Sequence, residues 1–402
     1  DKLLKFNTVI RSLQKREDKS YFPLFLKFRD RTIYYYLPPQ DQSGNQDLAI
    51  ADGDTIFLIN NWDIKSYKKY KKPVPLFLGQ YGKKTEENDN KTTMRAEEFA
   101  SKATGIDRLA YLRMDVDNLG KIFAKSLGSD LNLPRLAGLS GMMTYFFKVY
   151  LNSLAENRED NSQEFKKLTQ SSRKNLLFIY AGGDDLFISG AWDEVVEFAF
   201  DIYQSFRAYT GYNPSITLSG GVSLATIKYP LYQAASDSGE MEDKAKGNGK
   251  DSLSLFGQTF KWGEWLGYNE KGATIPNQEL CDYLDRTLPE LLGVLPFVKK
   301  LNENQVDYPR SFVRNLLNTA ALQEKAVKEA KEKFGEDSNY VKDTRYFLHL
   351  PKVAYTLSRL PDKLKENSAL MTSLKSPYNA PYFRAIATWI ELLNRQSSTG
   401  GE

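Results

Sequence analysis

The amino-acid sequence predicts an α+β fold: a ferredoxin-like domain, preceded by a small N-terminal β-rich module and followed by a C-terminal helical domain. Aromatic and β-branched runs dominate the first 94 residues. Between residues 95 and 257, apolar strands and amphipathic helices follow the order β-α-β-β-α-β, which is the ferredoxin-like order. From 258 to 402, apolar residues recur at helical spacing. We therefore expect three domains, at 1–94, 95–257 and 258–402.

The composition limits the possible functions. The 402 residues are too many for one ordinary core, and 41% hydrophobic and 26% charged residues are typical of a soluble globular protein. A net charge of +4 does not indicate bulk attraction to nucleic acid. One cysteine, Cys281, and one histidine, His349, exclude an internal disulfide and a Cys/His zinc site. A catalytic metal would have to be held by oxygen atoms, which suits Mg²⁺ or Mn²⁺.

No stretch of the sequence stays apolar for the length that a membrane-spanning helix needs. The longest candidate, 291–298, is short and contains Pro296. No signal peptide is apparent either. We therefore expect no membrane association and a cytoplasmic location.

Within the N-terminal module, the runs at 31–37 and 54–62 predict strands, and 38–47 and 83–93 predict polar loops. The segment KSYKKYKKP (65–73) interleaves five lysines with two tyrosines. Such a segment can contact a nucleic-acid backbone, but charge runs are common on solvated surfaces. We favour the solvated surface.

Each element of the central domain has its own pattern. Apolar runs predict strands, and apolar residues at helical spacing predict helices. Two of the strands are separated only by a Gly-Gly turn, which predicts a hairpin. The expected strands are 108–116, 175–181, 185–190, 215–225 and 252–256, and the expected helices are 134–155, 192–210 and 230–246.

In the C-terminal region the expected helices are 312–334, 345–361 and 381–395. The first of these has a strongly charged face, which favours a solvated helix of a bundle over a nucleic-acid arm. His349 lies among apolar neighbours, so a packed or surface histidine is favoured there over a catalytic one.

Two groups of aspartates lie where strands end. Asp115 and Asp117 stand at alternate positions after an apolar strand, and alternate strand residues share a face. Asp184 and Asp185 stand at the hairpin turn. If the two strands are neighbours, these carboxylates gather at one end of the sheet, where they can hold two divalent ions.

Glycines and lysines complete this predicted site. Gly182 and Gly183 let the backbone bend tightly and leave room for a triphosphate. Lys246 and Lys250, in KAKGNGKDS (244–252), can reach the β- and γ-phosphates, although the segment does not match the Walker A pattern. Ser219 lies on a strand that we expect to border the nucleotide. The combination is typical of a nucleotide cyclase/polymerase palm, so the sequence predicts phosphodiester synthesis from nucleoside triphosphates.

Five segments, taken in order, resemble a known family. They are RLAYLRMDVDNLGKIF (108–123), LPRLAGLSGMMTYFFKVYLN (133–152), LLFIYAGGDDLFISGAWDEV (176–195), LSGGVSLATIKYPLYQAA (218–235) and KAKGNGKDSLSLFG (244–257). In order and spacing they are similar to the second palm domain of the large subunit of type III CRISPR effector complexes, Csm subtype. The similarity continues upstream through 73–82 and downstream into the helical region, so it covers most of the chain.

The resemblance implies an activity and partners. The family's palm converts ATP to cyclic oligoadenylates when target RNA is bound, within a multi-subunit ribonucleoprotein that carries a guide RNA. The motif match implies Asp184 and Asp185 as the main metal-binding pair, Asp115 as a further carboxylate and the Val116 carbonyl as an additional ligand. The helical region would pack against the small helical subunit of the complex.

The sequence also departs from the family pattern. The usual large subunit carries an N-terminal HD nuclease and a first palm domain. One histidine cannot build an HD site, and the sequence has neither a second palm-like segment nor a cysteine-rich zinc element. We therefore expect a C-terminal portion of such a subunit, without DNase activity of the HD kind. Because the family's nucleotide pocket lies between two palms, the chain alone is expected to bind metal and ATP but to cyclise inefficiently.

Two other interpretations stay open. A GGDEF-type dinucleotide cyclase uses the same scaffold, but that family has Glu and Phe where this chain has Asp185 and Leu186. Its guanine-reading positions fall on Phe123 and Ala124, which favours adenine. The second interpretation is a non-catalytic scaffold of a ribonucleoprotein with a vestigial palm, and the retained aspartates argue against it.

Overall fold

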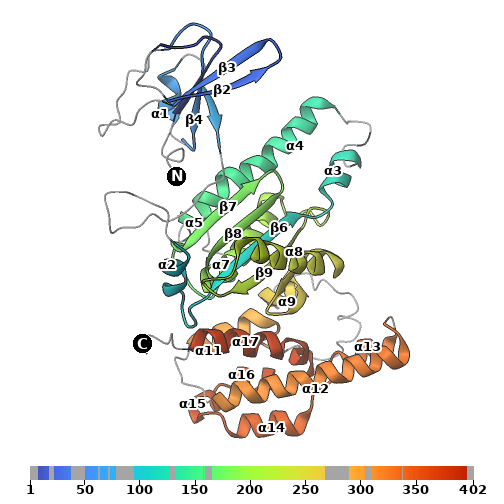
Figure 1. Cartoon of the computed structure of the whole chain (residues 1–402). Helices are drawn as coiled ribbons and strands as arrows, with labels where there is room; N and C mark the ends of the chain where they lie inside the picture. The colour runs from blue at the N-terminus through green and yellow to red at the C-terminus, as the bar shows by residue number, and fades with distance from the viewer. Residues whose placement is uncertain are drawn as a thin grey trace.

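The protein consists of a small N-terminal β-sheet, a larger helix-covered sheet and a group of C-terminal helices, placed one after another (Figure 1). The computed structural model describes residues 8–17, 22–37, 50–61, 64–70, 73–77, 95–125, 128, 132–156, 158, 165–267, 289–303, 310–336 and 338–395. The two sheets and their helices confirm the predicted α+β class. In these ranges no helix has both the length and the apolar character needed to span a membrane.

The N-terminal sheet has five strands in the order β2-β3-β1-β4-β5. Two of them, β3 (Arg31–Leu37) and β4 (Thr55–Ile59), confirm the strands predicted at 31–37 and 54–62. Three were missed: β1 (Thr8–Ser12), β2 (Phe22–Phe28) and β5 (Pro73–Leu76). The two prolines of β5 hide it from a pattern search, and the strand tolerates them because it lies at the sheet edge.

The lysine-rich segment between β4 and β5 begins as a short helix, α1 (Ile64–Lys68). In the described part of this segment the lysine residues are exposed, which both the solvated-surface and the nucleic-acid interpretation require. The polar loops expected at 38–47 and 83–93 lie outside the described residues.

The larger sheet has six strands in the order β11-β10-β9-β6-β8-β7. The strands are β6 (Leu109–Val116), β7 (Leu176–Gly182), β8 (Asp185–Ala191), β9 (Leu218–Ala225), β10 (Ser252–Leu255) and β11 (Gln258–Lys261). The central strand β6 pairs antiparallel with both β8 and β9, which is the ferredoxin-like arrangement that the element order predicted. Strand β10 adds parallel to β9, and β11, which was not predicted, adds antiparallel to β10.

Helices cover both faces of this sheet (Figure 1). On one face, Leu112 and Met114 of β6 join the main hydrophobic core with α7 (Trp192–Tyr209). On the other face, a smaller core holds residues of α2 (Ala96–Ser101) and α8 (Leu231–Gly247). Alternate side chains of β6 therefore belong to two different cores. For this reason the sequence of the strand is almost continuously apolar.

The long helix predicted over 134–155 is a continuous run of α4 (Leu133–Tyr145), a π-helical turn (Phe146–Tyr150) and α5 (Leu151–Glu156). Asn132 caps it by accepting the Arg135 backbone N–H at 3.0 Å. The sequence did not reveal the π turn, because Phe146 and Phe147 fit ordinary helical spacing. The short helix α3 (Leu119–Lys125) was also missed.

The C-terminal region is helical, as predicted, after β11. Its helices are α9 (Trp262–Leu266), α11 (Val294–Glu303), α12 (Arg310–Phe334), α13 (Asn339–Thr344), α14 (Leu350–Ser358), α15 (Asp362–Lys365), α16 (Ser368–Lys375) and α17 (Phe383–Asn394), with a 3-10 turn at Pro377–Tyr382. The helix predicted at 345–361 begins later, because His349 caps α14 by accepting the Lys352 N–H. The only histidine of the sequence therefore has a structural role, as the N-cap of α14.

One hydrophobic core runs from the sheet into the C-terminal helices. Phe200 of α7 stacks on Trp389 of α17 with ring centroids 5.8 Å apart. The indole N–H groups of Trp262 and Trp265 donate to the carbonyls of Leu218 and Leu253, at 2.7 and 2.8 Å. Because the sheet and this indole packing continue past residue 257, we propose to place the end of the central domain after α9.

A buried cluster of charges ties α7 to the segment before β7. Arg158 contacts Asp201 at 2.6 Å, and Arg173 contacts Glu197 at 2.8 Å. All four side chains are almost fully buried. Buried charges require such pairing, and the loss of one partner leaves the other uncompensated.

We expect Asp201→Ala to lower the free energy of unfolding by about 3–5 kcal/mol, because it leaves the buried Arg158 and Arg173 to share one carboxylate, Glu197. Urea unfolding measures this. Asp362→Ala is the control, since its ion pair with Lys365 is exposed and its loss should change little. Equal effects of the two variants would contradict the assignment of stability to the cluster.

The same cluster predicts an acid-sensitive fold. Burial acts to raise the pKa of Glu197, but Arg173, the Thr169 N–H and Arg158 outweigh it and hold the pKa below its usual value. The folded chain then binds fewer protons than the unfolded chain. Stability from Glu197 is complete above the unfolded pKa of about 4.3 and is lost as the pH falls toward the folded pKa. Glu197→Gln should therefore flatten the dependence of unfolding free energy on pH below about 5.

Candidate active site

The glycine-aspartate turn joins β7 to β8 as a two-residue hairpin. Gly182 pairs with Asp185, which leaves Gly183 and Asp184 as the turn residues. Gly183 has φ = +56°, a left-handed value that favours glycine at this place in a tight hairpin. Gly182 has little room for a side chain: a Cβ atom there would come within 3.1 Å of Lys148 Cε.

Strand register brings the third aspartate to this turn. Asp115 of β6 lies directly opposite Asp185 of β8 in the antiparallel ladder. The Val116 N–H donates to the Asp184 carbonyl at 3.1 Å, so the end of β6 is fixed against the turn. This pairing confirms the prediction that β6 and β8 are neighbours. The three aspartates Asp115, Asp184 and Asp185 therefore lie at one end of the sheet.

Lys246 reaches the same place from the last turn of α8. Its ammonium group contacts Asp115 Oδ2 at 2.5 Å and Glu242 Oε1 at 2.7 Å. The helix comes this close because Gly221 of β9 has no side chain: a Cβ atom there would lie 2.2 Å from the Glu242 backbone nitrogen. Gly221 thus sets the position of the lysine.

Lys250 reaches the end of β6 from the turn that follows α8. Its ammonium group donates to the Asn118 side-chain carbonyl. Lys250 and Asp251 both have positive φ values, +62° and +47°. Lys261 stabilises this unusual backbone by donating to the carbonyls of Gly249 and Lys250. Of the two lysines predicted to hold phosphates, Lys246 therefore contacts Asp115, and Lys250 contacts Asn118 just past the end of β6.

Asp117 and Ser219 form part of the scaffold instead. Ser219 is fully buried and its hydroxyl donates to Asp117 at 2.7 Å. Asp117 also accepts from the Thr217 hydroxyl at 2.7 Å and the Asp251 N–H at 3.0 Å. This corrects the expectation that Ser219 borders the nucleotide, because a fully buried hydroxyl already bound to Asp117 cannot touch a ligand. The pair instead joins β6, β9 and the turn of Lys250.

Negative charge is concentrated at the turn. Burial raises the pKa of Asp184, and the nearby charges of Asp115 and Asp185 raise it further. Burial acts to lower the pKa of Lys246, but its hydrogen bonds to Asp115 and Glu242 hold that pKa above the usual value. The site thus holds a protonated lysine, Lys246, and a carboxylate, Asp184, whose charged form is disfavoured by burial and by like charges.

Three neighbours of the turn were missed by sequence reasoning. The Tyr180 hydroxyl hydrogen-bonds Asp185, which raises the tyrosine pKa, and burial adds to this effect. Glu242 shares Lys246 with Asp115, and its spacing of four residues on a helix was a readable signal. Lys148 lies on the π-helical turn with its side chain beside Gly182, and no linear pattern connects the two.

Oxygen ligands at this end of the sheet suit a hard divalent cation. Within the described ranges, no three acidic, histidine or cysteine side chains are grouped closely enough to form a ready-made metal site, and Lys246 holds Asp115 in an ion pair. Burial, and then the charges of Asp115 and Asp185, raise the pKa of Asp184, and a bound cation would favour its charged form. The residues therefore fit Mg²⁺ or Mn²⁺ in chemistry, provided that Lys246 leaves Asp115.

We expect Asp184→Asn to raise the melting temperature measured in EDTA by about 1–2 °C, because it removes repulsion among three carboxylates. Added Mg²⁺ should stabilise the wild type more than the variant. Asp243→Asn, at an exposed position of α8, is the control and should respond like the wild type. A lower melting temperature of Asp184→Asn in EDTA would contradict the repulsion.

Comparisons with known proteins agree with this geometry. Residues 108–254 match the family model of the Cas10/Cmr2 second palm domain. A relative from Methanocaldococcus jannaschii, the CRISPR system single-strand-specific deoxyribonuclease Cas10/Csm1 of subtype III-A, is 35% identical over 54% of this chain and 29% of its own length. The protein of the same name from Streptococcus thermophilus is 40% identical over 40% of this chain and 20% of its own length.

Solved structures extend the similarity to the whole fold. A Csm1–Csm4 subcomplex of the type III-A CRISPR-Csm interference complex matches 98% of this chain and 48% of its counterpart, with a TM-score of 0.60 and 23% identity. A Csm1–Csm4 cassette in complex with pppApApA gives a TM-score of 0.61. The chain thus spans about half the length of these structures and less than a third of the curated relatives. Residues 108–254 are thus similar to the Cas10/Cmr2 second palm domain, within a chain whose fold resembles that of Csm1–Csm4 structures.

Proposed function

We propose that this chain is the nucleotidyltransferase palm of a type III CRISPR effector complex and converts ATP to cyclic oligoadenylate. One observation carries the proposal: Asp115, Asp184 and Asp185 meet at one end of the sheet, with Lys246 in contact with Asp115. Acidic oxygens beside mobile basic side chains are what phosphoryl transfer requires, because the chemistry depends on charge stabilisation and positioning.

Structural neighbours support the choice of substrate. Csm1–Csm4 cassettes with this fold have been crystallised with ATP, with AMPPNP, and with cA3 and cA4. Their identity to this chain is 22–23%, so they support the fold, while the family match at 108–254 supports the site. ATP as substrate is our extension from those proteins to this chain.

The residues have distinct proposed roles. Asp115, Asp184 and Asp185 would hold the divalent cations, Mg²⁺ or Mn²⁺, with the Val116 carbonyl as an additional ligand. A bound cation supplies Lewis-acid stabilisation of the attacking hydroxyl and the departing pyrophosphate. Tyr180 fixes the orientation of Asp185 through its hydroxyl.

Lys246 has two possible partners in this scheme. Without nucleotide it neutralises Asp115, and with nucleotide its ammonium group can exchange that carboxylate for the triphosphate. Lys250 and the backbone at Gly182 and Gly183 complete the phosphate contacts. A ribose hydroxyl of one ATP then attacks the α-phosphorus of another, a new P–O bond forms, and pyrophosphate leaves.

The remaining features of the proposal follow from the family. Phe123 and Ala124 stand where dinucleotide cyclases read guanine, which favours adenine here. The proposed partners are the other protein subunits, the guide RNA and the target RNA of the ribonucleoprotein, and a second palm that completes the nucleotide pocket. Since His349 caps α14, we propose that this chain carries no HD-type nuclease centre.

The double substitution Asp184→Ala, Asp185→Ala should lower oligoadenylate synthesis by at least about 100-fold, because it removes most of the negative oxygens at the turn. The measurement is turnover of labelled ATP by the large subunit assembled in its complex with target RNA. Asp243→Ala, exposed on α8, is the matched control and should keep full activity.

Two outcomes would overturn this proposal. Unchanged oligoadenylate output from the double variant would favour the non-catalytic scaffold. Turnover of GTP but not ATP would favour a dinucleotide cyclase of the GGDEF kind.

A further inference from the structure

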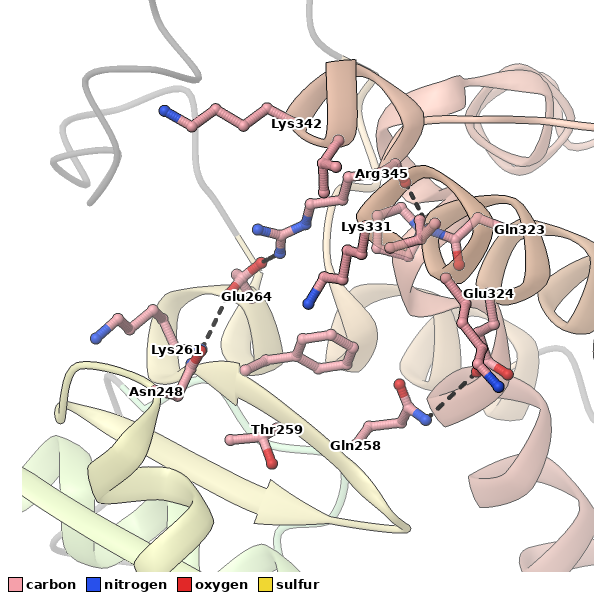
Figure 2. A pocket seen from close by; sticks show the side chains of 15 residues that line it. Asn248, Gln258, Thr259, Lys261, Glu264, Gln323, Glu324, Lys331, Lys342 and Arg345 are labelled. Atoms are coloured by element: carbon pink, nitrogen blue, oxygen red, sulfur yellow. Dashed lines mark hydrogen bonds and ion pairs between the residues drawn. The ribbon is translucent and has the colours of Figure 1, made fainter. Parts of the chain in front are cut away.

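A cavity lies between the β10–β11 hairpin and the helices α12 and α13. Its volume is about 750 Å³. Asn248, Gln258, Thr259 and Lys261 line it from the sheet side, and Gln323, Lys331, Lys342 and Arg345 line it from the helical side (Figure 2). None of the three aspartates of the candidate active site lines it.

The lining is strongly basic. Five basic side chains, Lys261, Lys328, Lys331, Lys342 and Arg345, face two acidic ones, Glu264 and Glu324. In Figure 2, Lys261, Lys331 and Lys342 come from three different elements, β11, α12 and α13. Such a surplus of positive charge around a concave surface attracts anions.

The two acidic residues leave a surplus of four lysines, because Glu264 pairs with Arg345 of the same lining and Glu324 pairs with Arg384 outside it. Glu264 forms an ion pair with Arg345 and accepts the Tyr382 hydroxyl at 3.0 Å. Glu324 forms a two-pronged ion pair with Arg384.

The lysines of α12 have weaker partners. Lys328 contacts Glu332 at 3.8 Å and Lys331 contacts Glu336 at 3.6 Å, both in exposed pairs. Exposed pairs contribute little, so a phosphate can replace them.

The cavity also has an apolar side. Phe260, Val327, Val341 and Pro381 contribute to its wall. Asn248 and Gln258 add amide groups that can donate and accept hydrogen bonds. A volume in the range of small-molecule sites, an apolar wall, a few amides and several lysines together match a nucleotide, which has an aromatic base and charged phosphates.

We propose that this cavity is a binding site for nucleotide phosphates, separate from the proposed catalytic centre. The ligand is a free adenine nucleotide or a nucleotide within a single RNA strand, since both present a base and phosphate groups. Its base would lie against the apolar wall and its phosphates against Lys331 and Lys342.

Lys261 connects this cavity to the catalytic centre. Its ammonium group holds the carbonyls of Gly249 and Lys250, whose turn carries the Lys250 side chain to Asn118. A phosphate in the cavity would compete for the Lys261 ammonium group and loosen this turn. Occupation of the cavity would thereby change how Lys250 is presented at the catalytic centre.

Charge reversal tests the proposal on the full chain. Lys331→Glu with Lys342→Glu places two negative charges at the cavity, and Lys325→Glu with Lys365→Glu makes the same change at positions outside it. Fluorescence anisotropy in EDTA would measure the binding of labelled ATP and of a labelled ten-nucleotide single-stranded RNA to each variant. All four lysines lie on the surface, and thermal unfolding checks that both variants remain folded.

The cavity variant should bind at least one probe about tenfold more weakly than the wild type, and the control variant should bind within about twofold of it. Loss confined to ATP identifies a free nucleotide as the ligand, and loss confined to RNA identifies a strand. Equal affinities of the cavity and control variants for both probes would overturn the proposal, because binding would then depend on overall charge or on the catalytic centre.

Discussion

The antiparallel register of β6 against β8 is the constraint on which the rest of the site depends. It places Asp115 opposite Asp185, and the hairpin turn then adds Asp184 beside them. A shift of one residue would send every side chain of β6 to the opposite face of the sheet. The register is protected because the two faces feed two different cores, so a slip would disrupt both. Core packing on both faces of the sheet therefore fixes the position of the carboxylates.

Three carboxylates gathered in this way repel one another. A lysine from a helix outside the sheet offsets part of this repulsion. Helix α8 brings Lys246 to Asp115, and it can do so because Gly221 allows the helix backbone to touch the strand. The buried pair of Asp117 and Ser219 then joins β6 to β9 and to the turn that carries Lys250. Asp117, Ser219 and Gly221 thus help to fix the positions of Lys246 and Lys250, which we propose to bind phosphate.

Much of this could be predicted from the sequence, for definite reasons. The order of strands and helices, the hairpin and the clustered aspartates are local patterns, and the structure confirms their arrangement. Ser219 was misplaced because a strand pattern shows which face a residue occupies but does not show that Asp117 captures its hydroxyl. Lys148 was missed because its proximity to Gly182 is a contact between segments far apart in the sequence, which no linear pattern reveals.

The shared hydrophobic core gives the molecule a mechanical property. Within the described residues, stacking of Phe200 on Trp389, together with the two tryptophans that donate to β9 and β10, packs the sheet, α9 and α17 into one core. We expect a displacement of α9 or α17 to be transmitted to the edge strands of the sheet through this shared packing. Helices far along the chain from the aspartates are therefore well placed to report contacts with other molecules to the sheet edge beside the Lys250 turn.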